Sequence, residues 1–354
     1  MQQAVKRQHQ IPVFYLTRFA SGGKICVRWR DGKIIDVSPR NVAVEIGFYD
    51  IPDGEGGTSD VVETWLLGSA VEGPAAAAMK AIDQCGHPPP IGSADRWALA
   101  AFLALQITRT TAHRDESMFQ ERVLHWAHGQ EITRDLVAEY LEHEHLGFKP
   151  RDPEVEAAFV YVSEAAKEPS VLTPDWSVMV MIDNAGYILP ILLDLNWTIE
   201  VDPKREYLTS DKPVVLWRKP TKRDNYDGLG VATSEEIRFP LDPGKQLVMS
   251  RRKRPDVLEA AVHRVRRSNR DLADSCHRFI IGSPDSRAKI EAQPLAARRP
   301  VIRFWTAPLY VPGPDGQMQK QEGEVIQMMV PRRAGVGPPP ARPMPTDERL
   351  LPQR

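Results

Sequence analysis

The segment of residues 93–114 constrains the fold of this chain most, because its middle has no polar side chain. As a helix, Trp97–Leu105 would be apolar on every side, and such a helix has to lie inside a core with other elements around it. Polar side chains return at Gln106, Arg109 and His113. At about 100° per residue these three fall on one helical face. The sequence therefore predicts a buried helix that ends in a polar stripe.

Strands are expected on both sides of a helical middle. Residues 24–30 alternate apolar and polar side chains, which is the period of a half-buried strand, and the Asp31-Gly32 pair that follows favours a hairpin turn. Amphipathic patterns predict helices over residues 58–167. The Val-, Ile-, Leu- and Met-rich residues 176–250 predict strands, and residues 255–281 predict a last helix.

This order of elements is typical of an α+β fold rather than of βαβ alternation. N-terminal strands in residues 11–50 are expected to pair with a C-terminal antiparallel sheet in residues 176–250, around the mostly helical middle and its buried central helix. Residues 1–285 are therefore predicted to be a single domain. Residues 286–330 are expected to be an irregular extension. The Pro- and Arg-rich residues 331–354 cannot bury enough apolar area to fold alone and are predicted to be a disordered tail.

Composition excludes several classes of protein. The 354 residues carry a net charge of −1, so the chain as a whole does not attract nucleic acid. Cys26, Cys85 and Cys276 lie far apart without zinc-binding spacing, which indicates free thiols in a reducing compartment. The polar N-terminus and the lack of an apolar run of about 20 residues predict a cytoplasmic protein with no membrane contact.

The familiar catalytic motifs GxSxG, the P-loop and HExxH are absent from the sequence. His143 and His145 would lie about 200° apart on a helix and could not share one metal ion. Asp183 and Asp194 fit the turns of a strand hairpin better than a metal-dependent nuclease core. No metal-binding or cofactor-binding residue is therefore expected, and the sequence leaves open which cofactor, if any, the protein uses.

Arg109 is the strongest candidate for a functional residue. A charged side chain on so apolar a helix needs a partner, because an unpaired buried charge is very costly. Glu72 and Asp211 are the candidate partners, and we expect Glu72, since Asp211 has hydrogen-bond partners available in the turn Ser210–Pro213. Arg109 then either fixes the register of the fold or binds an anionic ligand.

Basic residues are concentrated towards the C-terminus. Between Arg251 and Arg278 there are nine basic and four acidic residues, whereas Glu131–Glu168 has ten acidic and four basic residues. In the predicted last helix, one face carries Arg264, Arg266, Arg267 and Arg270. Such a face is either solvated, docked on the acidic helices, or a surface for nucleic acid.

Asn269 lies in the middle of the apolar face of the same predicted helix. A buried Asn side chain without hydrogen bonds costs about 1–3 kcal/mol of stability, so Asn269 has to be hydrogen-bonded. The purely structural interpretation is a hydrogen bond from the Asn269 side chain to a neighbouring backbone group.

Several segments together resemble a bacterial family, the domain-of-unknown-function family four-two-three-eight. The first block is His9–Phe19, which is similar to the family's His-x-x-Pro-x-Phe-Tyr-Leu-x-x-Phe pattern. The others are Asn41–Tyr49, Glu63 with Glu72, Arg96 with Gln106–Arg109, Thr209–Pro213, and Asn269 with His277–Phe279. The resemblance covers about residues 7–285, so it implies a domain boundary there, and it implies no particular activity.

Six polar positions from different elements each have a reason to face inward. They are His9, Glu72, Gln106, Arg109, Asp211 and Asn269. Convergent polar groups in apolar surroundings are typical of a ligand-binding or catalytic site. Our first hypothesis is a ligand-binding or enzymatic domain for a small anionic or phosphate-bearing molecule. The alternative is an interaction module that binds nucleic acid or an acidic partner through residues 251–270.

Overall fold

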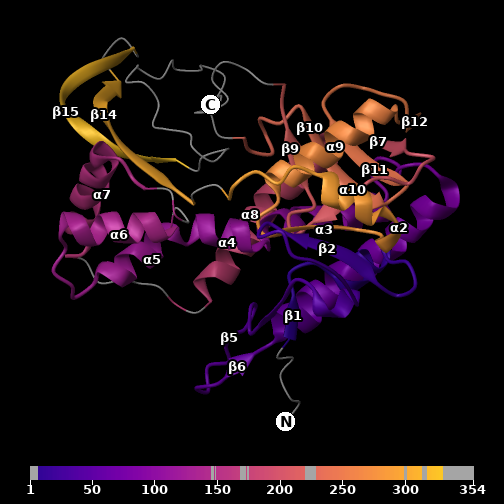
Figure 1. Ribbon diagram of the computed structural model, residues 1–354, viewed down its shortest axis with the longest axis horizontal. Coiled ribbons are helices and arrows are strands. Elements are labelled where there is room, and N and C mark those ends of the chain that lie inside the picture. Colours follow the sequence, from indigo (N-terminus) through magenta and orange to yellow (C-terminus); the bar gives the residue numbers. More distant parts are fainter. Residues whose placement is uncertain are drawn as a thin grey trace. The chain divides into compact units, whose positions relative to one another are not determined.

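The computed structural model describes residues 7–144, 147, 149–167, 173, 175–219, 229–298, 301–312 and 317–329; the predicted tail 331–354 lies outside them. The chain forms two compact units. Unit 1 comprises Met1–Met118, Leu172–Pro220 and Leu229–Arg298, and unit 2 comprises Phe119–Val171, Thr221–Gly228 and Arg299–Arg354. Helices and several sheets occur together, which confirms the α+β class (Figure 1).

The apolar segment forms the central helix α3 (Ala94–Thr108) of unit 1. Ser93 caps its N-terminus by accepting a hydrogen bond from the Arg96 N–H, and the helix is buried almost continuously from Ala98 to Gln106. It packs between α2 (Gly73–Cys85) and α8 (Trp176–Asp194). The prediction of a buried central helix is therefore confirmed.

The predicted polar stripe requires one helix that continues to His113, but α3 ends at Thr108. Thr110 begins a new helix, α4 (Thr111–Ser117), by accepting a hydrogen bond from the His113 N–H at 3.2 Å. A threonine hydroxyl that caps a following helix offers the backbone an alternative to continuing the first one. Gln106 and Arg109 therefore share a face, and His113 belongs to a different element.

A five-stranded sheet covers the central helix. Its strands, in spatial order, are β12 (Val257–Glu259), β7 (Asn196–Val201), β11 (Lys245–Ser250), β10 (Glu236–Asp242) and β9 (Val215–Trp217). Strands β10 and β11, in the part of the chain that was expected to form strands, pair as an antiparallel hairpin. Along β10, Ile237 and Phe239 face the apolar core, where Phe239 meets Phe102 of α3 at a ring distance of 6.0 Å.

The alternate positions of this sheet are polar and yet buried. Glu200, Glu236 and Arg238 are each at most 5% exposed, because α9 (Val262–Ser275) lies over this face and bonds to β7, β10 and β11 (Figure 1). The sheet thus has an apolar face toward α3 and a charged face toward α9.

A second sheet joins the two ends of unit 1. Its order is β3 (Ile34–Val37), β2 (Ile25–Trp29), β13 (Phe279–Gly282) and β8 (Thr209–Ser210). The Asp31-Gly32 hairpin between β2 and β3 is confirmed, with Gly32 at φ +91°. The N-terminal strand β2 pairs with β13, however, and not directly with the strands of residues 176–250 as expected.

Short elements complete unit 1. The N-terminal part contains β1 (Arg7–His9), α1 (Val13–Thr17), the 3₁₀ helix η1 (Pro39–Asn41), β4 (Val44–Ile46), β5 (Ile51–Pro52), β6 (Thr58–Ser59) and the π-helix η2 (Val62–Glu72). The C-terminal part ends with the 3₁₀ helix η3 (Pro284–Ser286) and α10 (Arg287–Ala292). β1 pairs with β4 and β5 pairs with β6.

Residues 11–20, expected as a strand, contain the helix α1 instead. Tyr15 and Phe19 are four residues apart, are both fully buried, and meet edge to face at 5.5 Å. Phe19 follows the end of α1, and a four-residue spacing shares one face of a strand as well as of a helix. The aromatic content of the segment, which favours strands, therefore misled the prediction.

Residues 176–194, expected as two strands around a turn, form the single helix α8. An apolar run without a clear period does not distinguish a strand from a buried helix. Asp183 and Asp194 are therefore exposed helix residues and not hairpin turn residues. With 19 residues and a mean hydropathy of 1.5, α8 is long and apolar enough to cross a membrane by length and composition alone, and it packs on α3 in unit 1.

The predicted helix 255–281 is shorter than expected, because strands precede and follow it. Leu258 lies in β12 and Phe279 in β13, so neither belongs to the apolar face of α9. That face retains Val265, Asn269 and Leu272, all buried.

Unit 2 combines helices α5 (Phe119–Ala127), α6 (Arg134–Glu144) and α7 (Asp152–Ala165) with a hairpin of β14 (Arg303–Pro312) and β15 (Met318–Met329). The helices are confirmed. Residues 301–330 were expected to be irregular or short extended structure, and their described part is extended, in strands of 10 and 12 residues that are longer than expected. Phe304 of β14 meets Phe119 at 6.0 Å, and Arg303 pairs with the buried Glu154 carboxylate at 2.5 Å. The hairpin completes a core that the helices cannot close by themselves.

Candidate functional site

Arg109 is held by a complete set of partners at the C-terminal end of α3. Its Nη1 donates to Glu72 Oε1 at 2.7 Å, while Nε and Nη2 donate to Gln106 Oε1 at 3.1 and 2.7 Å. The Arg109 side chain is fully buried, and its guanidinium lies over the Phe102 ring at 5.6 Å. The predicted pairing with Glu72 rather than with Asp211 is confirmed.

The π-helix η2 brings a second carboxylate to this ion pair. Glu63 and Glu72 are nine residues apart, which would place them about 180° apart on an α-helix. A π-helix has ~4.4 residues per turn, so the same spacing is about two turns and returns to the same face. Val61 and Trp65, which an α-helix would place on the face of Glu72, are exposed instead.

Glu63 has an unusual environment within this cluster. One carboxylate oxygen accepts the His9 N–H at 3.4 Å, and the other, Oε2, is buried without a hydrogen-bond partner among the described residues. Burial, followed by the nearby Glu72 carboxylate, raises the pKa of Glu63 to about 7. The Glu63 carboxyl is therefore close to half protonated at neutral pH.

His9 lies beside the same cluster. Its Nε2 is 3.2 Å from the Arg40 carbonyl oxygen, and it interacts electrostatically with Glu72 and Arg109. Burial is the main cause that lowers the pKa of His9. Its imidazole is therefore neutral at neutral pH and adds no positive charge to the cluster.

Asp211 is linked to the cluster only at a distance. Its two carboxylate oxygens accept the N–H groups of His277 and Arg278 at 2.9 and 2.6 Å. Arg278 in turn donates to Gln10 Oε1 at 2.8 Å, and the Gln10 carbonyl accepts from Gln106 Nε2 at 3.2 Å. Asp211 therefore positions the start of β13 and does not contact Arg109.

Asn269 does not join the cluster. Its Nδ2 donates to the Glu206 carbonyl at 2.7 Å and its Oδ1 accepts the Leu208 N–H at 3.0 Å. This is the expected backbone interaction, which fixes α9 against the chain before β8. Of the six candidate residues, the structure thus brings together His9, Glu72, Gln106 and Arg109.

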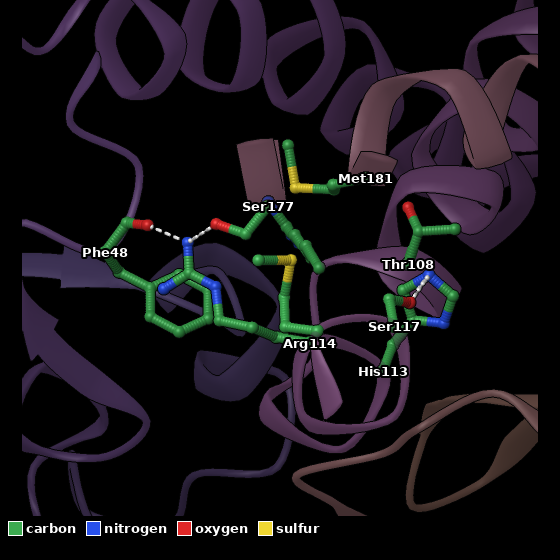
Figure 2. A pocket seen from close by; sticks show the side chains of 9 residues that line it. Phe48, Thr108, His113, Arg114, Ser117, Ser177 and Met181 are labelled. Atoms are coloured by element: carbon green, nitrogen blue, oxygen red, sulfur yellow. Dashed lines mark hydrogen bonds between the residues drawn. The ribbon is translucent and has the colours of Figure 1, made fainter. Parts of the chain in front are cut away.

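A small pocket lies beside this cluster, where α3 and α4 meet (Figure 2). Its cavity volume is only about 10 Å³, roughly enough for one water molecule, so a larger group could enter only if side chains that line the pocket moved. Its polar lining is Thr108, Arg109, His113, Arg114, Ser117 and Ser177, and none of its described lining residues is acidic.

Arg114 is the exceptional side chain of this pocket. Its Nη2 donates to the Phe48 carbonyl and to Ser177 Oγ, the latter at 2.8 Å, and its guanidinium stacks 3.7 Å from the centre of the Phe48 ring (Figure 2). No described carboxylate lies within ion-pair distance of it. Burial is the main cause that lowers the pKa of Arg114, and the more distant Glu45 and Asp115 carboxylates oppose it only weakly, so the structure holds a partly desolvated cation without a directly paired carboxylate among the described residues.

His113 lies across the pocket from Arg114. Its Nε2 is 3.2 Å from Ser117 Oγ (Figure 2) and also 3.2 Å from Asn184 Nδ2. Because the Asn184 amide donates, Nε2 accepts, and burial lowers the pKa of His113. His113 is therefore a neutral acceptor here and not a second cation.

The sequence reasoning missed Arg114 as a site residue and treated Glu63 only as part of the family resemblance. The lack of a carboxylate partner is a property of the folded structure, and no residue pattern in the chain signals it. Among the described residues, no group of three His, Cys, Asp or Glu side chains could hold a metal ion.

Residues 7–286 match the family described as "Protein of unknown function (DUF4238)". Because the match spans well over half of the chain, this protein belongs to that family. The boundaries agree with those expected from the resemblance. No curated protein and no solved structure matches the chain.

Proposed function

We propose that unit 1 binds a small anionic ligand, through a phosphate or similar group, in the pocket beside Arg109 and Arg114. The observation that carries the proposal is the Arg114 guanidinium, which lines a pocket without acidic residues and has no ion-paired carboxylate in the described part of the chain. A desolvated cation is costly unless it is paired, and an incoming anion would supply the missing charge. Arginine also fits phosphate geometry with its planar set of donors.

In this proposal Arg109 supports the site rather than serving as its main ligand. Each of its three nitrogens already donates one bond to Glu72 or Gln106, so only one N–H group on each of Nη1 and Nη2 remains for another partner. Its residual role is to form one wall of the pocket. Ser117 and Ser177 would offer hydroxyl donors to the bound anion, as hydroxyl groups commonly do for phosphate.

The proposal places this binding in a reducing, cytoplasmic compartment. Cys26, Cys85 and Cys276 are free thiols, and free thiols are typical of proteins kept in such compartments.

The test is thermal unfolding of the full chain with inorganic phosphate, against sodium chloride at the same ionic strength. A ligand that binds only the folded state at 100 times its Kd adds about 2.7 kcal/mol to stability, so phosphate should raise the wild-type Tm. Arg114→Met should lose this response, whereas Arg134→Met, which removes an exposed arginine of unit 2, should keep it.

A second variant keeps the proposal testable if Arg114→Met does not fold. Ser177→Asp puts a carboxylate next to the Arg114 guanidinium and should raise the Tm without phosphate while abolishing the phosphate response. An unchanged wild-type Tm, or an equal phosphate response in Ser177→Asp, would overturn the proposal.

A further inference from the structure

Exposed basic side chains gather on two segments of unit 1 that the proposed pocket does not use. On α9 the exposed residues include Arg266, Arg267 and Arg270, and in the loop after β11 they are Arg251, Arg252 and Lys253. We call these six residues the outer basic face. Asp256, Glu259 and Asp274 are the exposed acidic residues of the same segments, so the positive charges outnumber the negative ones twofold.

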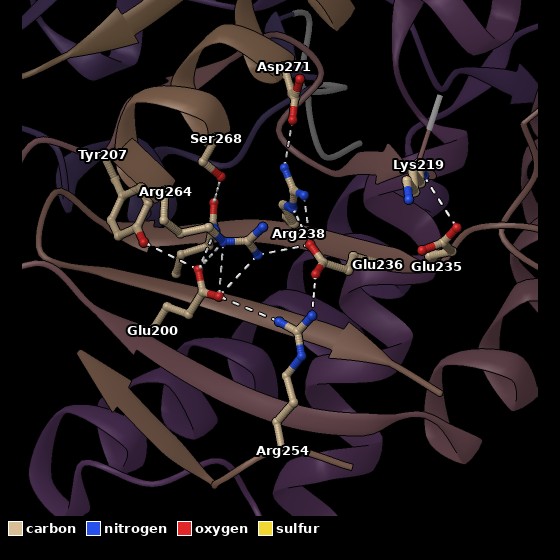
Figure 3. A network of polar contacts seen from close by, with 11 residues as sticks. Glu200, Tyr207, Lys219, Glu235, Glu236, Arg238, Arg254, Arg264, Ser268 and Asp271 are labelled. Atoms are coloured by element: carbon tan, nitrogen blue, oxygen red, sulfur yellow. Dashed lines mark hydrogen bonds and ion pairs between the residues drawn. The ribbon is translucent and has the colours of Figure 1, made fainter. Parts of the chain in front are cut away.

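The arginines beneath this face are neutralised, unlike those on it. Arg264 donates to Glu200 and Glu236 at about 3 Å, and Arg238 pairs with Glu236 and Asp271 (Figure 3). Burial alone would raise the pKa of Glu236, but Arg238 and Arg264 outweigh it and lower that pKa to about 2. Arg264 was expected on the exposed face, and the structure turns it inward.

The outer basic residues have no such partners. Arg266, Arg267 and Arg270 make no ion pair or side-chain hydrogen bond with any described residue. Arg266 and Arg270 are also four residues apart, so their charges repel each other along the helix, at about 0.2–0.5 kcal/mol for such a pair. Asp274, four residues after Arg270, offsets one of these charges, and the excess of positive charge that remains on the helix surface favours a polyanionic partner.

The two segments lie next to each other. Arg254, at the end of the loop, and Arg264, in the first turn of α9, approach the same two carboxylates, Glu200 and Glu236 (Figure 3). The basic loop therefore borders the N-terminal part of α9. Its positive charges extend the surface that the helix presents.

The helix that carries the face is fixed to the sheet below. Ser268 Oγ donates to Gln246 Oε1 at 2.7 Å, and Arg238 bonds to Asp271 Oδ2 at 2.7 Å (Figure 3). Asn269 adds two bonds to the chain before β8. Binding at the outer face would therefore order only side chains and not the helix itself, which lowers the entropic cost of association.

We propose that the outer basic face binds the phosphate backbone of nucleic acid. Arg266, Arg267 and Arg270 span about 6 Å along the helix axis at 1.5 Å per residue, a length that covers neighbouring phosphates of one strand. The contacts are to phosphates and not to base edges, so the binding is independent of base sequence.

The test is fluorescence anisotropy of the full chain with a labelled 20-base-pair DNA duplex at 50 mM salt. The wild type should bind, with a Kd that weakens steeply as salt rises. Arg266→Glu, Arg267→Glu and Arg270→Glu combined should weaken binding at least tenfold and lower the salt dependence. The control combines Lys24→Glu, Lys80→Glu and Lys204→Glu, which make the same change of charge at exposed positions elsewhere.

A milder variant, with glutamine at the same three arginine positions, guards against disruption of α9 by the reversed charges. It should fold as the wild type does by circular dichroism and still bind less tightly. No wild-type binding at 50 mM salt, equal losses in the lysine control, or equally tight binding of polyglutamate or of anionic phospholipid vesicles would overturn the proposal. Arg114→Met should bind the duplex normally, so this test is independent of the pocket.

Discussion

Arg109 and Arg114 are five residues apart and have opposite surroundings. Arg109 is fully buried, and each of its three nitrogens donates a hydrogen bond to Glu72 or Gln106. Arg114 is stacked on Phe48 with no acidic partner. The sequence points to Arg109 because its helix is so apolar, and that same environment explains why the fold has already compensated its charge.

Arg109→Met should therefore destabilise the protein. Removing one partner of a buried ion pair leaves the other charge uncompensated, at a typical cost of about 3–5 kcal/mol. Glu72 is partly exposed, so we expect the lower end of this range. Combining Arg109→Met with Glu72→Gln should recover much of the loss, since the neutral amide needs no counter-charge.

Urea unfolding of both variants measures this coupling, with Arg134→Met as an exposed control that should change stability by less than about 1 kcal/mol. Additive effects of the two substitutions would contradict the structural role of the pair.

At the scale of the element, η2 shows what a sequence pattern does not encode. An amphipathic helix after residue 58 was predicted, but the residue pattern does not distinguish π-helical from α-helical geometry there. That geometry decides whether Glu63 and Glu72 share a face. The sequence thus led to Glu72 as the partner of Arg109, and the convergence of Glu63 on it depends on backbone geometry alone.

Glu63→Gln should alter the pH dependence of stability. The pKa of Glu63 is raised to about 7 in the folded state, so its contribution is fully present below the unfolded pKa near 4.5 and is lost as the pH rises through 7. At pH 8 the neutral amide should make the variant more stable than the wild type. The difference is about 1 kcal/mol once solvent screening of the partly exposed carboxyl is allowed for.

Thermal unfolding from pH 4.5 to 8.5 tests this expectation, and the difference between the two proteins should vanish at the acidic end. A constant difference across that range would show that Glu63 does not titrate as inferred. Glu139→Gln, at a carboxyl of unit 2 outside the cluster, is the control and should follow the wild type.

Other elements show where local patterns suffice. The β2–β3 and β10–β11 hairpins follow from their turn residues, and helices α2, α3, α5, α6 and α7 follow from the spacing of apolar residues, which acts within a few positions. The separate helix α4 was not predicted. The predictions failed for α1 and α8, where apolar and aromatic content fits a strand or a helix equally well. In those segments, packing in the tertiary core decides between a helix and a strand. The helices place Tyr15 and Met181 in buried positions of unit 1.

At the scale of the whole molecule, the chain forms two units with separate apolar cores. The core of unit 2 includes Phe119 and Phe304, and the core of unit 1 includes Phe102 and Phe239. The sequence predicted one domain over residues 1–285, and no local feature of the helices from Phe119 onward distinguishes them from those before. Their strand partners come from beyond residue 300, which only long-range contacts show.

Deleting residues 299–354 should unfold unit 2 and leave unit 1 folded. The deletion removes Phe304 from its contact with Phe119 and leaves the buried Glu154 carboxylate without Arg303. Limited proteolysis with mass spectrometry should then show cuts in residues 119–167 and protection of α3. Deleting only residues 331–354 should change neither.

If the shorter deletion exposed α5–α7 to protease, the tail would contribute to the fold. Loss of protection throughout the longer deletion would instead support one cooperative domain.

The pairing of β2 with β13 has a consequence for how the chain is made. Residues 25–29 and 279–282 lie side by side, so the sheet they share cannot form on the ribosome until most of the protein has been synthesised. During that interval β2 has an unpaired edge, and α3 is without α8 and the strands that cover it. Closing so long a loop is slow, and exposed apolar surface of this kind is prone to aggregate. We expect the nascent chain to depend on chaperones until β13 has emerged.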